Sequence, residues 1–179
     1  MQVCYTHRLP ELLATLATWM AETGGAELLL HAGDAVERSE PSLVAQAVAQ
    51  LEMVHPRIHL ALGNHDLTTP DALDLWLKRA GELLPAGHTA FSATLDDCTI
   101  HVLPTQWGNE PYFWDGGPPR ACLDPADLAW LDARLYAEPD RAQIVVCHAA
   151  PAGVPAEQTG RSEEMDPPPL EYTLALRGL

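Results

Sequence analysis

Apolar residues along the chain alternate between helical spacing and short continuous runs. Between Leu9 and Met20, leucines recur every three or four positions, which is typical of one buried face of a helix. The next segment, ELLLHAGD (27–34), is a short apolar run that ends in Gly-Asp, and it predicts a strand. The chain therefore begins with a helix followed by a strand.

The same alternation continues in the next part of the chain. SEPSLVAQAVAQLEMV (39–54) predicts a helix, with Ser39 or Ser42 as its cap and Pro41 in its first turn. The apolar run RIHLAL (57–62) follows it and predicts a second strand.

Two further patterns fill the middle of the chain. TTPDALDLWLKRAG (68–81) repeats the helix signal, with Pro70 near its start and Gly81 as a stop. AFSATL (90–95) and TIHVLP (99–104) flank Asp-Asp-Cys, which predicts a β-hairpin.

The last third of the chain returns to helix and strand signals. LDPADLAWLDARLYAE (123–138) predicts a helix with Asp124 as its cap and Pro125 at its first position. The run QIVVCHAAP (143–151) predicts a strand, and LEYTLALRGL (170–179) predicts a final helix. No repeat or long linker interrupts the pattern, so we expect one α/β domain with largely parallel strands plus a hairpin.

Length and charge narrow the classes of function. With 179 residues, 47% of them hydrophobic, the whole chain fits a single domain, residues 1–179, with a substantial core. Ten Lys and Arg residues face 25 Asp and Glu residues, a formal charge of −15. This excess repels a phosphate backbone, so long nucleic acid is not expected as a partner. A small phosphorylated substrate held by bound cations remains compatible with it.

Sequence features also bear on the cellular compartment. No apolar run approaches the ~20 residues of a membrane span, and no basic and apolar leader is present. We therefore expect a cytoplasmic protein that does not enter a membrane, and its oligomeric state stays open. The four cysteines contain no Cys-x-x-Cys pair and predict reduced thiols: Cys4, Cys98, Cys122 and Cys147.

Residues of metal-ligand type follow several expected strands. VCYTH ends in His7, LLLHAGD ends in Asp34, LALGNHD carries Asn64 and His65, and IVVCH ends in His148. In open α/β sheets, ligands bind at the carboxyl ends of strands. Each residue alone has a structural explanation, as a cap, a turn residue or a hydrogen-bonded histidine. Together they form a mixed oxygen and nitrogen set that suits Mn, Fe or Zn better than Ca.

In the order GDAVER, GNHD and VVCHAAP, the sequence resembles the calcineurin-like metallophosphoesterase family over most of its length. The resemblance implies an α/β fold, a β-sandwich flanked by helices (α/β/β/α), here expected to be shortened at the C-terminus. It also implies two divalent metal ions at the strand ends, with Mn, Fe or Zn as the candidates. The expected activity is hydrolysis of a phosphomonoester or phosphodiester through this dinuclear centre.

The resemblance further implies a role for individual residues. Asp34 would bridge both metals, and His7 would bind the first. His65 would be the catalytic histidine, which protonates the alcohol that leaves. The other roles carried over are the second metal for Asn64 and His148, orientation of the histidine for Glu37, and contact with the substrate phosphate for Arg38.

Two positions depart from the pattern of the family. Tyr5 stands where the family has its first aspartate, and no GHxH motif follows His148. A phenol with an ordinary pKa near 10 is a poor substitute for a carboxylate.

Three interpretations therefore stay open: an active phosphoesterase, a degenerate member that binds a phosphorylated ligand without turnover, and a protein-interaction domain. The last would use the loop from Thr105 to Arg120, which carries Trp107, Tyr112, Phe113 and Trp114. In an enzyme, the same loop would form a wall of the substrate pocket, or it would cover the core.

Overall fold

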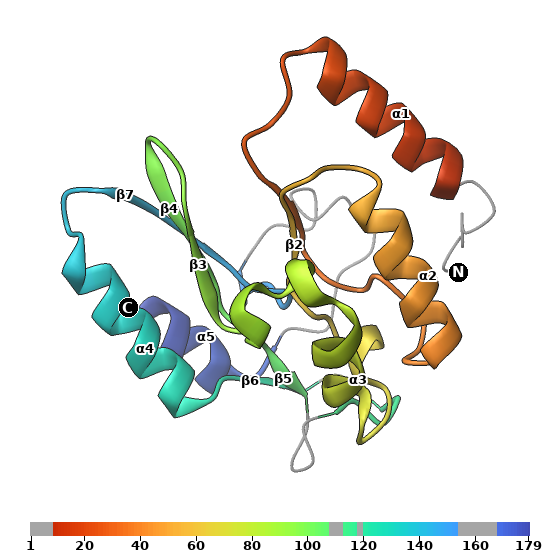
Figure 1. The fold of residues 1–179 in the computed structure, drawn as a ribbon. Coiled ribbons are helices and arrows are strands. Elements are labelled where there is room, and N and C mark those ends of the chain that lie inside the picture. The colour runs from red at the N-terminus through yellow and green to blue at the C-terminus, as the bar shows by residue number, and fades with distance from the viewer. Residues whose placement is uncertain (1–8, 108–112, 118–119, 154–167) are drawn as a thin grey trace.

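The computed structural model describes residues 9–107, 113–117, 120–153 and 168–179, and these form a mixed α/β fold (Figure 1). Its helices are α1 (Leu9–Glu22), α2 (Pro41–Glu52), α3 (Ala72–Arg79), α4 (Pro125–Ala137) and α5 (Leu170–Arg177). Its strands are β1 (Leu29–His31), β2 (Ile58–Leu60), β3 (Phe91–Thr94), β4 (Cys98–Val102), β5 (Gln106–Trp107), β6 (Ala121–Cys122) and β7 (Ala142–Val146). Short 3₁₀ turns are η2 (His65–Leu67), η3 (Gly81–Leu83) and η4 (Pro85–Gly87).

The strands pair in three small sheets. β1 and β2 are parallel, with Leu30 opposite His59. In the second sheet, of order β3-β4-β7, β3 and β4 form the expected antiparallel hairpin and β7 runs parallel to β4. β5 and β6 form a short antiparallel ribbon, which the sequence pattern did not predict.

Helices flank the strands on two sides, as the view in Figure 1 shows. Helices α1, α2 and α3 lie on one side of β1 and β2, and helices α4 and α5 lie on the other side, beyond the β3–β4 hairpin. The fold class expected from the sequence is confirmed: this is a mixed α/β architecture consistent with a helix-flanked sandwich.

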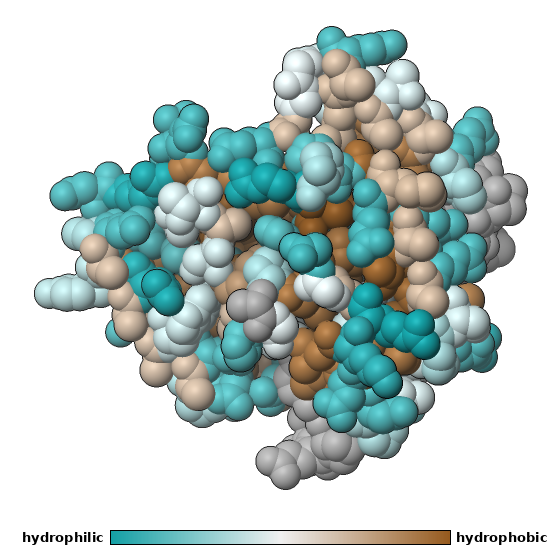
Figure 2. All heavy atoms as spheres, in the orientation of Figure 1, coloured by the Kyte–Doolittle hydropathy of each residue, from teal (hydrophilic) through white to brown (hydrophobic). Residues whose placement is uncertain are grey.

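The main apolar core lies where α2 and α3 meet the β1–β2 sheet. Trp76 of α3, Leu60 of β2 and Val44 of α2 are fully buried there. The indole N–H of Trp76 donates to the carbonyl of Asp66 at 2.7 Å, so this large side chain is buried without an unpaired donor. In Figure 2, apolar residues gather in the middle of the face shown and hydrophilic residues surround them.

The starts of two helices differ from each other in their capping. Helix α4 is capped as expected, because the Asp124 carboxylate accepts the N–H of Ala126 at 2.7 Å. The predicted serine cap of α2 is wrong: its N-cap is Glu40, whose side chain makes no capping hydrogen bond. The hydroxyl of Ser39 instead donates to the carbonyl of Asp66 at 2.8 Å, a long-range contact that the local sequence does not reveal.

Helix α3 also begins and ends at other residues than the sequence pattern predicted. It begins at Ala72, after Asp71 as N-cap, and it ends at Arg79 with Ala80 as C-cap. Gly81 opens the following 3₁₀ turn η3 and does not end the helix itself. Among the helices of the described ranges, none is long and apolar enough to cross a membrane. The described cysteines, Cys98, Cys122 and Cys147, are free thiols.

We expect Asp124→Ala to lower the free energy of unfolding by about 0.5–2 kcal/mol, since it removes the acceptor for an N–H of the first turn of α4. Urea unfolding followed by circular dichroism measures the loss. Glu40→Ala is the matched control, because Glu40 occupies the same position of α2 without such a bond. Equal losses in the two variants would contradict the capping role of Asp124.

Candidate metal centre

Three loops that follow β1, β2 and β7 meet at one point. The carboxylate Oδ1 of Asp34 lies 3.5 Å from the Nε2 atom of His148, although the two residues are far apart in sequence. The Nδ1 atom of His148 lies 2.8 Å from the carbonyl oxygen of Ala32. The loop after β7 is thus attached directly to the loop after β1, as the strand-end pattern predicted.

The contact with Ala32 determines which nitrogen of His148 carries the proton. A carbonyl oxygen only accepts hydrogen bonds, so Nδ1 must be the donor. In the neutral ring, the lone pair of Nε2 then faces the Asp34 carboxylate. Backbone carbonyl groups orient metal-binding histidines in proteins in the same way.

Two glycines allow this close approach of the loops. A Cβ atom on Gly33 would lie 2.3 Å from Nδ1 of His148, and Gly33 has a φ of 105°, which favours glycine. A Cβ atom on Gly63 would lie 2.2 Å from Oδ1 of Asp34 and 2.7 Å from Cε1 of His148. The glycines of the GD and GNHD segments are therefore needed for space around the two candidate ligands.

The buried carboxylate of Asp66 holds two of these loops in place. Its Oδ2 accepts the N–H of Asp34 at 2.8 Å and that of Gly63 at 2.9 Å, and its Oδ1 accepts the N–H of Val36 at 3.1 Å. Asp34 has a φ of 57°, the left-handed region, and within the described ranges it is the single non-glycine residue there. The bonds to Asp66 hold this unfavourable backbone conformation, which aims the Asp34 side chain at His148.

Burial raises the pKa of Asp66 to about 6, and the nearby Asp34 carboxylate acts in the same direction. The N–H groups of Gly63, Val36 and Asp34 oppose this rise, because they stabilise the ionised form. Asp66 is the last residue of the GNHD segment, but its role as the anchor of both loops was not foreseen from the sequence.

His65 lies beside the Asp34–His148 pair. Its backbone N–H donates to Oδ1 of Asp34 at 3.1 Å. Its ring Nδ1 lies 3.1 Å from the Glu37 carbonyl oxygen and 3.9 Å from the Glu37 carboxylate. The ring also packs against Trp114, with 4.7 Å between centroids. Glu37 therefore contacts the His65 ring more closely through its backbone carbonyl than through its carboxylate. The contact with the carbonyl requires a proton on Nδ1 and leaves Nε2 for another partner.

Of the remaining candidate residues, the structure describes Asn64 and Arg38. Asn64 is buried at the start of η2, next to His65, and no hydrogen bond of its amide is found within the described ranges. Arg38 points to Glu40, with 3.3 Å between Nε and Oε1, and both side chains are exposed. His7 and Tyr5 lie outside the described residues.

One residue near the site, His31, was not singled out in the sequence, and Trp107 of the aromatic loop also lies there. His31, at the end of β1, is close enough to Asp34 and His148 to interact with both. Burial lowers the pKa of His31, and Asp34 opposes this shift. The indole of Trp107 packs edge-on against the His148 ring, with 5.8 Å between centroids. The sequence did carry a signal for His31, because it is a titratable residue within the apolar run LLLHAGD.

The donor chemistry of this cluster fits a divalent cation. A carboxylate and an imidazole lone pair face each other at 3.5 Å, and a cation between them would relieve the repulsion of two acceptors. The Asn64 amide adds a neutral oxygen of the kind that such a site uses. Within the described residues, however, no group of three or more His, Cys, Asp or Glu side chains is arranged to hold a metal ion. Asp34 and His148 thus supply part of a metal site and not a complete set of ligands.

Comparison with known proteins identifies the family. A model of the calcineurin-like phosphoesterase family matches residues 5–178. Because the match spans nearly the whole chain, the chain belongs to this family, whose general chemistry is metal-dependent hydrolysis of phosphoester bonds. A search of curated proteins found no match to the chain.

We expect Gly63→Ala to displace Asp34 or His148, because its Cβ would overlap both side chains. Binding of Mn²⁺, measured by isothermal titration calorimetry, should weaken by about 10-fold or more. Gly178→Ala is the matched control, since its Cβ would meet only ordinary contacts at 3.4 Å or beyond. Unchanged Mn²⁺ affinity in folded Gly63→Ala would mean that the metal binds elsewhere.

Proposed function

We propose that this chain hydrolyses the phosphomonoester or phosphodiester bond of a small substrate at the site formed by Asp34, His148 and His65. The observation that carries the proposal is the meeting of these three residues, from three strand ends, around Oδ1 of Asp34. The net charge of −15 supports a small substrate over long nucleic acid, which it would repel. A cytoplasmic location belongs to the same proposal.

The site would hold two divalent metal ions, with Mn, Fe or Zn as candidates. Asp34 would bridge both ions, with Asn64 and His148 on the second and His7 on the first. Bound divalent ions would polarise the phosphoryl group and lower the pKa of a water molecule. The described residues contribute a carboxylate, an amide and an imidazole to this set, which are suitable donors.

His65 would supply the proton for the leaving alcohol. Its Nδ1–H is held by the Glu37 carbonyl, so Nε2 is the atom that would carry and release this proton. The Glu37 carboxylate lies 3.9 Å from the same Nδ1 atom. The indole of Trp114 covers one side of the ring and limits its contact with water.

Arg38 would contact a substrate phosphate. In the structure it pairs with Glu40, and both side chains are exposed. An exposed ion pair of this kind contributes about 0–1 kcal/mol, so an incoming phosphate could replace Glu40 at little cost.

A second candidate function is binding of a phosphorylated ligand without turnover. Tyr5 in place of the first aspartate favours it, because this change removes a metal ligand. Hydrolysis of an aryl phosphomonoester and an aryl phosphodiester with added Mn²⁺, together with elemental analysis of the protein, separates the two. Two metals per chain with turnover support the phosphoesterase, and ligand binding without turnover supports the second candidate.

Asp34→Asn should abolish activity and metal uptake, because the amide lacks the charge needed to bridge two cations. We expect bound metal, measured by elemental analysis, and kcat/KM each to fall by more than about 100-fold. Asp132→Asn on the exposed face of α4 is the matched control and should leave both values unchanged. Activity that survives Asp34→Asn would show that the assigned site is wrong.

His65→Ala should lower kcat by about 10²–10⁴-fold and retain bound metal, because His65 is assigned as an acid and not as a principal ligand. His88→Ala in an exposed turn is the control with the same chemical change. Loss of metal together with activity would instead make His65 a ligand.

A further inference from the structure

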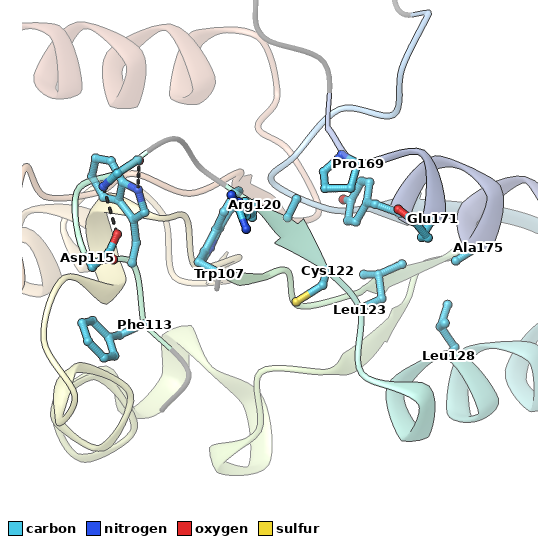
Figure 3. A pocket seen from close by; sticks show the side chains of 14 residues that line it. Trp107, Phe113, Asp115, Arg120, Cys122, Leu123, Leu128, Pro169, Glu171 and Ala175 are labelled. Atoms are coloured by element: carbon cyan, nitrogen blue, oxygen red, sulfur yellow. Dashed lines mark hydrogen bonds between the residues drawn. The ribbon is translucent and has the colours of Figure 1, made fainter. Parts of the chain in front are cut away.

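A cavity of about 710 Å³ opens beside the candidate metal centre (Figure 3). It lies between the β5–β6 ribbon, residues 113–117 and helix α5. In the view of Figure 3, Trp107 and Arg120 lie centrally, with Phe113 and Asp115 on one side and Glu171 of α5 on the other. The volume is in the range of pockets that hold small organic molecules.

Two tryptophans connect this cavity to the candidate metal centre. Trp107 contributes to the cavity wall and its ring meets His148, with 5.8 Å between centroids. Trp114 contributes to the same wall and its ring meets His65, with 4.7 Å between centroids. The backbone N–H of Trp114 also donates to the Leu67 carbonyl at 2.6 Å, which holds this segment against η2. The two tryptophan rings are therefore shared between the cavity wall and the histidines of the candidate metal centre.

The wall chemistry favours an uncharged aromatic group. Trp107, Phe113, Trp114 and Tyr172 supply ring faces or edges, on which planar rings stack. The charged residues of the wall, Asp115, Glu171 and Arg120, leave a net charge of only −1. The cavity is thus not an anion site, and the phosphate of a substrate would have to lie at the metal centre.

Most polar groups of the wall already have partners. The Tyr172 hydroxyl donates to the Ala149 carbonyl at 2.7 Å, and the Trp114 indole N–H donates to the Gly117 carbonyl at 2.6 Å. The indole N–H of Trp107 is different: it is buried and, within the described residues, it has no hydrogen-bond partner. An unpaired buried donor is costly. The N–H is not exposed to the cavity in the free protein, so the Trp107 side chain must shift before an acceptor on a bound molecule can remove this cost.

We propose that the cavity beside Trp107 and Trp114 binds the alcohol portion of the substrate, and that this portion carries a planar aromatic ring with a hydrogen-bond acceptor. A mononucleotide is a phosphoester of this class: its base would stack in the cavity and its phosphate would reach Asp34 and His148. This assignment of substrate class rests on the proposed phosphoesterase function of the same site. It separates aromatic phosphoesters from sugar phosphates and from phosphorylated serine or threonine side chains, which have no ring.

Binding of nucleosides tests the cavity without phosphate or metal chemistry. We compare adenosine and uridine with ribose by isothermal titration calorimetry on the whole chain. At least one nucleoside should bind about 10-fold tighter than ribose, because stacking of the base adds to the affinity. Equal affinity of all three compounds would overturn the proposal.

Two substitutions test which groups of the cavity wall bind the nucleoside. Phe113→Leu keeps apolar bulk but removes an aromatic wall, and Trp107→Phe removes the unpaired N–H but keeps a ring. Each should lower the nucleoside-to-ribose affinity ratio by about fivefold or more. Trp19→Phe is the matched control, since Trp19 is 58% exposed on α1 and should leave the ratio unchanged. A ratio that stays the same in both cavity variants would also overturn the proposal.

Hydrolysis measured on the same protein keeps the two proposals apart. Nucleoside binding without hydrolysis of any phosphoester in Mn²⁺ would overturn the enzymatic function and leave the cavity assignment standing. Hydrolysis of aryl and sugar phosphates with equal kcat/KM, and no preference for nucleosides over ribose, would support the enzyme and overturn the assigned substrate class.

Discussion

The arrangement of the site depends on one buried carboxylate. The Asp66 carboxylate accepts hydrogen bonds from three backbone N–H groups in the loops after β1 and β2. Its backbone carbonyl accepts hydrogen bonds from the hydroxyl of Ser39 and from the indole N–H of Trp76. These bonds connect the loops of the site to the core of α2 and α3. They also hold Asp34 in the left-handed conformation, which is unfavourable for a residue with a Cβ atom. Without Asp66, the direction of the Asp34 side chain would not be defined.

Close packing then brings the third loop to the same point. His148 is attached to the Ala32 carbonyl, and its ring lies in a space that only glycine leaves open at positions 33 and 63. Hydrogen bonds to backbone carbonyls orient His148 and His65 alike, so each ring directs its second nitrogen away from the main chain. This fixed orientation is what metal binding and proton transfer both require, because it removes the need to order the rings when a substrate arrives.

The aromatic segment links the chemistry to recognition of a substrate. Trp107 and Trp114 each contact one histidine of the site and also form part of the wall of the neighbouring cavity. They therefore serve the core, the orientation of the site and the shape of the cavity together. Members of one fold family differ in substrate because such segments differ, while the strand-end residues keep their place.

Local sequence patterns determined much of the secondary structure of this protein and the positions of several site residues. Periodicity predicted the five described helices and the hairpin, and the GD and GNHD segments placed Asp34, Asn64 and His65 at the ends of strands, because such signals involve neighbouring residues only. The tertiary structure alone decided the rest: Ser39 bonds to Asp66 instead of capping α2, Glu37 reaches His65 through its carbonyl, and Trp107 meets His148. These contacts join residues distant in sequence, and their distances depend on how the sheets and loops pack, which no local pattern encodes.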